Sequence, residues 1–204
     1  MKKGFLLTAF LVSSLHFISA QKKSATADIT ANIGTYAVFM KPARSDILAQ
    51  HLQPFYGFGV QANLMTPLKL GLGASYSYLI SNVKYGQEQA AFNQGSPRMS
   101  QADVYIVYAS PLAESSTAEP FAGGSFYRLT TRPEENKSTY AVNMAGFTAG
   151  ITFLHPIDRE EQQSLFVTPK INVMFPPSPD QHPFSLVQKE TILLSISAGY
   201  RYQF

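Results

Sequence analysis

The strict alternation of apolar and polar residues along several segments constrains this fold more than any other feature. It is clearest at the end of the chain, where one face carries Ile192, Leu194, Ile196, Ala198, Tyr200, Tyr202 and Phe204. The other face carries Ser195, Ser197, Gly199, Arg201 and Gln203, with Leu193 as its one apolar member. A period of two residues is typical of a β-strand whose faces meet different environments. The segment therefore predicts a strand with one apolar face.

Seven further segments are interpreted as strands on the same ground. They span residues 28–40, 56–64, 68–80, 101–109, 121–129, 140–153 and 165–175. Gly123 and Gly124 blur the two faces of one segment. Pro169 interrupts another, because proline donates no hydrogen bond to a strand ladder, so we expect a bulge or a locally unpaired position there. The sequence predicts eight strands in all.

The polar faces of these strands indicate which side meets water. They are rich in Gly and Ser rather than Lys and Glu, and only 14% of the chain is charged. A solvated face usually carries charge, whereas a narrow barrel lumen needs small side chains. Several segments also reach the ~9–11 residues that a membrane-spanning strand needs. We expect an all-β fold, an eight-stranded antiparallel up-and-down transmembrane β-barrel with apolar groups facing lipid.

The first 20 residues are interpreted as an export signal. Lys2 and Lys3 precede an apolar run at residues 5–12, and a small residue, Ala20, ends the segment. This order of regions is typical of a secretory signal peptide, and the run is too short for a membrane-spanning helix. We expect cleavage after Ala20, which divides the chain into a signal peptide at 1–20 and one barrel domain at 21–204.

Composition excludes several classes of site. The chain has no cysteine, so disulfides, zinc–thiolate sites and cysteine nucleophiles are excluded. Without Lys2 and Lys3, the 16 basic residues become 14, against 13 acidic ones, so no basic surface predicts a nucleic-acid partner. No phosphate-binding glycine loop or metal-ligand spacing is present, and we expect no cofactor and no metal.

The lengths of the connections suggest an orientation. One set comprises residues 66–67, 110–119 and 155–164, and the other comprises 41–53, 82–100, 131–139 and 176–190. Short turns at one end and long loops at the other are typical of outer-membrane barrels, whose long loops face outwards. We therefore expect both termini in the periplasm and a surface partner, of unknown identity, at the long loops.

With these features, the chain resembles the small outer-membrane β-barrel family, the OmpA/OmpX-like barrels. The resemblance is carried by the Ala20-Gln21 junction and by residues 119–124, 166–170 and 200–204. It implies an outer-membrane location, contact with outer-membrane lipids and assembly by the barrel assembly machinery. Members of this family end in alternating aromatic residues that this machinery reads, and Tyr200, Tyr202 and Phe204 match that pattern.

The lumen of an eight-stranded barrel is just wide enough for its side chains to fill it, so charges there need partners. We expect two lumenal ion pairs, Asp28 with Arg201 and Asp103 with Arg128. Lys69 and Lys170 are also expected to point inward, with no partner that the sequence identifies.

The expected function is a structural or surface-interaction role without catalysis and without an open pore. One alternative is a barrel enzyme acting on outer-membrane lipids, for which His51 near Ser45 and Asp46 is the arguable cluster, while His155 and His182 are expected in connections. The other alternative is a secreted soluble barrel that binds an apolar ligand inside, as lipocalins do.

Overall fold

The computed structural model describes residues 29–43, 47–84, 96–113, 116–131, 140–176 and 190–204. Within these ranges nine strands and one short helix are found. They are β1 (Thr30–Pro42), α2 (Ile47–His51), β2 (Phe55–Met65), β3 (Leu70–Ile80), β4 (Arg98–Tyr108), β5 (Ser110–Ala113), β6 (Ser116–Thr131), β7 (Tyr140–Pro156), β8 (Gln163–Met174) and β9 (Thr191–Gln203). No helix in the described ranges is long and apolar enough to cross a membrane.

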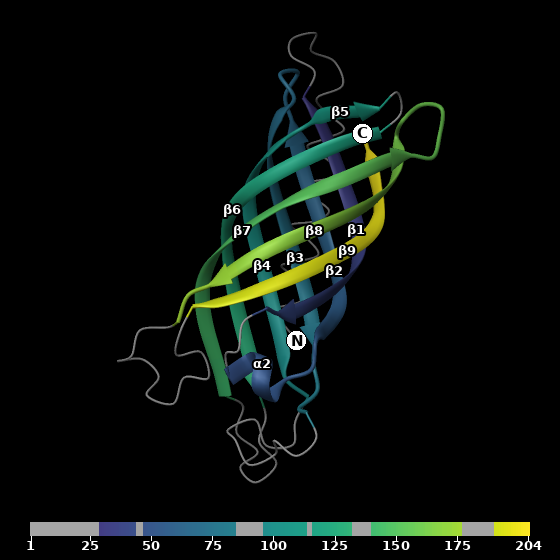
Figure 1. Ribbon diagram of the computed structural model, residues 1–204. Helices are drawn as coiled ribbons and strands as arrows, with labels where there is room; N and C mark the ends of the chain where they lie inside the picture. Colours follow the sequence, from purple (N-terminus) through teal and green to yellow (C-terminus); the bar gives the residue numbers. More distant parts are fainter. Residues whose placement is uncertain (1–28, 44–46, 85–95, 114–115, 132–139, 177–189) are drawn as a thin grey trace, which may run out of the picture.

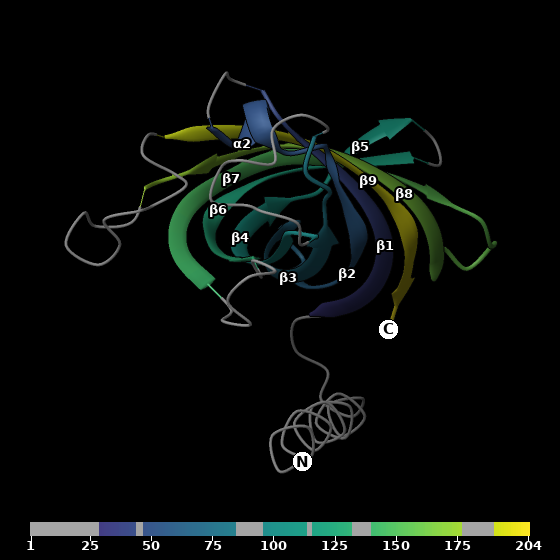
Figure 2. The ribbon, with the colours of Figure 1, turned by 90° about the horizontal axis from the view of Figure 1, so that it is seen from below.

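Eight of the nine described strands close into an antiparallel barrel. Each strand pairs with its neighbour in the sequence, β4 pairs with β6, and β9 returns to pair with β1. The ring is visible along its axis in Figure 2. The short β5 pairs with β6 alone and lengthens the β4–β6 hairpin beyond the ring (Figure 1). The predicted all-β, eight-stranded antiparallel barrel is confirmed, while the signal peptide and its cleavage site lie outside the described residues.

The proline in β8 is accommodated by a local gap in the ladder. The β7–β8 pairing runs from Gly146 opposite Met174 to Gly150 opposite Lys170, and it resumes at Phe153 opposite Val167. The register is the same on both sides of the gap, so no residue bulges out. Pro169 still has a partner on its other side, in β9. The expected locally unpaired position is therefore present.

The apolar faces of the strands point outward. Leu70 and Leu72 on β3 are 50% and 62% exposed, and Leu194 and Ile196 on β9 are 48% and 52% exposed. Leu193 and Ser195, on either side of Leu194 in the sequence, are buried, as the two-residue period requires. A lipocalin-like barrel would gather these leucines and isoleucines in a dry centre. That alternative is wrong for this chain.

The two ends of the barrel differ in their connections. Residues 66–69, 114–115 and 157–162 join strands at one end, whereas 43–54, 81–97, 132–139 and 175–190 join them at the other. The start of β1 and the end of β9 lie at the short-turn end, and α2 lies at the long-loop end (Figure 1). The expected link at 110–119 is mostly strand, so the asymmetry is sharper than the sequence predicted.

Candidate functional site

The interior at the long-loop end is an apolar plug, defined by inward side chains that are each at most 1% exposed. Its members are Met40, Leu48, Leu52, Phe55, Leu79, Met99, Leu129, Met174 and Leu193. Two of them, Leu48 and Leu52, come from α2 and the residue after it rather than from a barrel strand. The expectation of small, hydrophilic groups throughout the lumen is wrong for this half. Leu193, the apolar exception in the terminal strand, is explained by its place in the plug.

The α2 segment is fastened to the strand end beside it. Leu52 forms an isolated antiparallel bridge with Val83. The backbone amide of Gln53 donates to the backbone carbonyl of Asn82 at 2.8 Å, and the Ser81 hydroxyl donates to the backbone carbonyl of Gln53 at 2.6 Å. These bonds hold the plug residues of α2 in the barrel mouth. The proposed cluster of His51 with Ser45 and Asp46 is not described, because residues 44–46 lie outside the described ranges.

The middle of the lumen is organised around Asp103, which is 2% exposed. Its carboxylate accepts from the Ser125 hydroxyl at 2.6 Å, the Gln101 amide at 2.8 Å and the Ser75 hydroxyl at 2.9 Å. The Lys170 ammonium forms an ion pair with the same carboxylate, at 2.9 Å from Oδ2. Four donors fill most of the acceptor capacity of one carboxylate, which a buried charge requires.

Asn172, which is fully buried, extends this network to the far wall. Its side-chain oxygen accepts from the Gln101 amide at 2.9 Å and from the Thr148 hydroxyl at 3.1 Å. The Asn172 amide donates to the Ser195 hydroxyl at 3.3 Å. Gln101 therefore joins the Asp103 and Asn172 centres. Neither amide was predicted as a site residue, although both occupy the polar face of an alternating segment.

Two tyrosine rings cross the lumen in space left by glycines. The Tyr36 hydroxyl lies 2.8 Å from the Ser77 hydroxyl, and the Tyr105 hydroxyl is hydrogen-bonded to the Asn63 amide group at 2.9 Å. A Cβ at Gly59 would collide with the Tyr36 ring, and one at Gly73 would collide with the Tyr105 ring. These two glycines are in the lumen, as the sequence indicated.

The second lumenal ion pair joins Arg201 to Glu119, nearer the short-turn end. The Arg201 guanidinium donates to the Glu119 carboxylate at 2.6 Å, and both side chains are at most 7% exposed. The guanidinium carbon of Arg201, Cζ, lies 5.6 Å from the centre of the Phe166 ring, a cation–π distance. Asp28, the predicted partner of Arg201, lies outside the described residues. Glu119 was missed because it was placed in a connection rather than in β6.

The other predicted lumenal charges require correction. Asp103 pairs with Lys170 rather than Arg128, so that predicted pair is wrong. Arg128 is exposed on the outer face, because Tyr127 and Leu129 take the inward positions of β6. Lys69 is exposed in the turn before β3, where its φ of 62° breaks the extended alternation on which the inward prediction depended. Lys170 does point inward.

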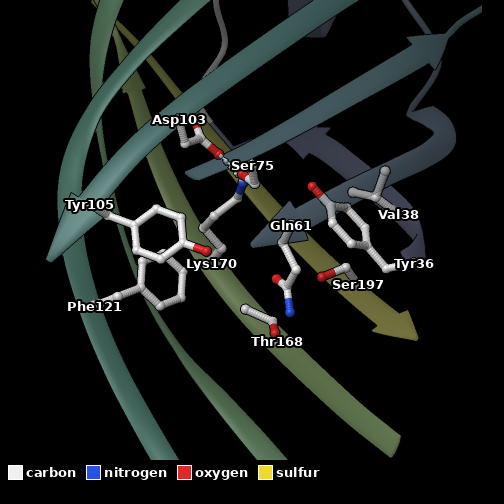
Figure 3. A pocket seen from close by; sticks show the side chains of 10 residues that line it. All are labelled: Tyr36, Val38, Gln61, Ser75, Asp103, Tyr105, Phe121, Thr168, Lys170 and Ser197. Atoms are coloured by element: carbon white, nitrogen blue, oxygen red, sulfur yellow. Dashed lines mark hydrogen bonds and ion pairs between the residues drawn. The ribbon is translucent and has the colours of Figure 1, made fainter. Parts of the chain in front are cut away.

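Little space remains between these side chains in the middle of the barrel. A cavity of about 20 Å³ lies beside Lys170, with Gln61, Tyr105 and Thr168 among its walls (Figure 3). Figure 3 shows the Lys170 ammonium beside Asp103 and Ser75, on one side of this space. Such a volume holds a water molecule but no organic ligand, since ligand pockets are usually about 300 Å³ or larger.

One serine–histidine contact occurs at the short-turn end. The Ser116 hydroxyl lies 3.3 Å from His155 Nδ1, and His155 is in β7 rather than in a turn, which corrects its expected place. No carboxylate in the described ranges is hydrogen-bonded to that imidazole, so the contact lacks the third member of a catalytic triad. Within the same ranges no three potential metal ligands are grouped. His182 lies outside them.

The C-terminal aromatic residues follow the outer face of β9. Tyr200 is 38% exposed, and its hydroxyl donates to the Gln163 side chain at 3.0 Å. The Tyr202 and Phe204 rings meet edge to face at 5.0 Å between centres. All three lie near the short-turn end.

No protein-family model matches the sequence, and no curated protein matches it either. Solved structures do match its fold. Neisserial surface protein A aligns with a TM-score of 0.59 at 14% identity, over 85% of this chain and 97% of that one. OprG from Pseudomonas aeruginosa aligns with a TM-score of 0.59 at 11% identity, over 87% and 97% of the two chains.

A third match is Ail, the attachment invasion locus protein of Yersinia pestis. It has a TM-score of 0.50 at 9% identity, over 86% of this chain and 97% of that one. A structure of Ail in complex with the heparin analogue sucrose octasulfate is also similar. Identities this low establish the fold alone. In architecture, this chain is a small eight-stranded barrel of the outer-membrane type.

Proposed function

We propose that this chain is an integral outer-membrane barrel with a structural or surface-interaction role. The observation that carries the proposal is the exposed apolar face that surrounds a closed ring of strands, with Leu72 62% and Phe58 77% exposed. A soluble monomer rarely exposes a contiguous apolar surface of this kind, whereas lipid solvates it. Membrane barrels also leave no open sheet edge, and the eight strands here close into a ring without one.

The interior supports a barrel that does not conduct. The plug closes the long-loop end, and Asp103 with its donors fills the middle. An open water-filled channel is a property of wider barrels, because eight strands leave room only for their side chains. In planar bilayers the purified protein should show no steady conductance. Porin-like steps would contradict this part of the proposal.

The long-loop end is proposed to face outwards and to carry any recognition. The sharp asymmetry of the connections supports this orientation. That Neisserial surface protein A and Ail share the fold is compatible with a surface role. No described Ser–His–carboxylate group supports the enzyme alternative.

Fractionation combined with a heat-modifiability gel tests location and folding together. We expect the protein in the outer-membrane fraction, with faster migration before boiling than after it. An epitope inserted within residues 81–97 should be labelled on intact cells. One inserted within residues 66–69 should be labelled only after permeabilisation. Recovery in the soluble periplasmic fraction, or the reverse labelling, would overturn the proposal.

We further propose that the aromatic terminus is the assembly signal. Phe204 is 53% exposed and makes one ring contact, so its truncation removes little packing. Phe204→Ala should therefore lower insertion in cells while leaving refolding of the purified protein into detergent unchanged. The matched variant is Phe153→Ala, an equally outward phenylalanine at 41% exposure. Equal insertion of the two variants would refute the signal role.

A further inference from the structure

Two arginines lie on the outer face near the long-loop end, on neighbouring strands. Arg98 is the first residue of β4, and Arg128 lies three residues before the end of β6. Both side chains are exposed. Ser100 is directly opposite Arg128, and Arg98 is directly opposite Thr130, so the two arginines are diagonal neighbours. Diagonal positions on one face of a sheet are about 7–8 Å apart, close enough for two guanidinium groups to reach one anion.

The residues directly opposite Arg128 on its two neighbouring strands are hydrogen-bonding groups rather than acids. Asn143 on β7 is directly opposite Arg128, on the other side from Ser100. The Tyr76 hydroxyl donates to the Ser100 hydroxyl at 3.2 Å. Neither arginine forms an ion pair with any carboxylate in the described ranges. Two cations with no carboxylate partner in the described ranges, beside the hydrogen-bonding groups Ser100 and Asn143, are complementary to an oxyanion.

An apolar hollow lies next to the arginines on the outer face, on the side towards the middle of the barrel. On the next rung, Phe126 is 71% exposed and stands between two alanines, Ala102 and Ala145. These small residues leave a surface hollow of about 550 Å³, and Ser100, Arg128 and Asn143 also line it. One rung further down is Gly124, where an added Cβ would meet nothing within 4 Å. The outer face of β6 is therefore also open at Gly124.

The two rims differ in net charge. At the long-loop end, the exposed charged residues of the described ranges are Lys41, Arg98, Arg128 and Glu190. At the short-turn end, those of the described ranges are Lys69, Arg159, Glu160 and Glu161. The first set is net positive and the second is neutral. Among the described residues, the long-loop rim is thus the one suited to a leaflet with anionic headgroups.

We propose that this face binds a phosphate-bearing lipid of the outward leaflet. It rests on the proposed function, since it requires the barrel to lie in the outer membrane with the long loops outside. Arg98 and Arg128 bind the phosphate, Ser100 and Asn143 donate to the oxygens around it, and an acyl chain lies in the hollow beside Phe126. Arginine suits this task because its planar fork of donors matches phosphate oxygens.

The test is a binding titration of the purified barrel, read by native mass spectrometry. The probes are diphosphoryl lipid A, the same lipid after dephosphorylation, and inorganic phosphate. We expect the phosphorylated lipid to bind preferentially. The double variant Arg98→Gln and Arg128→Gln should bind it at least about tenfold more weakly, since a hydrogen bond between charged groups contributes roughly a factor of that order. Arg159→Gln, an exposed arginine at the opposite rim, should bind as the unaltered protein does.

A second variant tests the hollow without touching the arginines. Ala145→Leu adds a larger side chain at an exposed residue that lines the hollow, so it should fold normally and still weaken lipid binding. Equal binding of the phosphorylated and dephosphorylated lipids would overturn the proposal. So would unchanged binding by the arginine double variant, or full displacement by inorganic phosphate at the lipid's own concentration.

Failure of this inference is distinguishable from failure of the proposed function. If the unaltered protein fractionates with the outer membrane and is heat-modifiable but does not discriminate between the lipids, only the lipid site is wrong. If the unaltered protein is soluble and periplasmic, the proposed function is wrong and the lipid site is wrong with it.

Discussion

The two halves of the barrel interior are built from different chemistry although the same strands line both. Towards the long loops, the inward residues are Met40, Phe55, Met99 and their apolar neighbours, closed by α2. In the middle and towards the short turns, the inward residues are hydrogen-bonded around Asp103 and Arg201. Both halves face the interior of the barrel. The comparison shows that an inward side chain in such a barrel needs contacts that fill its surroundings. Either apolar packing or paired, hydrogen-bonded charges can provide them.

The largest effect is expected in the polar half, from Asp103→Ala. The change leaves the Lys170 ammonium buried without its carboxylate. Breaking one partner out of a buried ion pair costs about 3–5 kcal/mol. Urea unfolding of the protein in detergent, followed by circular dichroism, measures the loss.

The control for this variant is the neighbouring outward residue, Val104→Ala, which removes no inward contact. Replacing the pair together, with Asp103→Leu and Lys170→Met, should recover much of the stability because no buried charge remains. Equal destabilisation by Asp103→Ala and Val104→Ala would show that the ion pair does not hold the lumen together.

The next effect is expected in the apolar half, from Leu48→Ala in α2. Leu48 is 0% exposed, and truncation of a buried leucine costs about 2–3 kcal/mol where the surroundings can partly relax. Gln50→Ala, on the exposed side of the same helix, should be nearly silent. The same unfolding measurement applies. Similar small losses for both variants would mean that α2 lies on the barrel mouth without closing it.

Glu119→Gln sharpens the comparison within the polar half. Arg201 would lose its charged partner but keep its place beside the Phe166 ring. We expect a cost of about 2 kcal/mol, within the range for hydrogen bonds to charged groups. Glu160→Gln on the exposed turn is the control. A loss exceeding that of Asp103→Ala would reverse the ranking of the two ion pairs.

The smallest effect is expected from filling a lumenal glycine. In Gly59→Ala the new methyl group collides with the Tyr36 ring, which must shift and strain its bond to Ser77. Overpacking of this kind costs about 1–2 kcal/mol. Gly124→Ala, where the outer face is open, should change stability by less than about 0.5 kcal/mol. Thermal unfolding of the pair checks this, and equal values would place both glycines in open space.

The sequence predicted the barrel because alternation persists wherever the two faces of a strand meet different environments. It predicted charge partners poorly. Register decides which inward residues meet across the lumen, and Asp103 and Lys170 are 67 residues apart on strands that do not pair. Arg128 was misplaced because Gly123 and Gly124 hid the phase of β6, and Lys69 because a turn residue was counted as strand. The α2 plug had no sequence signal, since a five-residue helix inside a loop shows no periodicity.

The most direct test of the inside-out arrangement uses two adjacent residues of β4. Val104 is 65% exposed on the outer face, whereas Tyr105 is 7% exposed in the lumen. The chain contains no tryptophan, so Val104→Trp and Tyr105→Trp each place a single fluorophore at one depth in the membrane. In vesicles of brominated phosphatidylcholine, the tryptophan at position 104 should be strongly quenched and the one at 105 should be spared. Quenching of position 105 with sparing of position 104 would contradict an apolar face turned towards lipid.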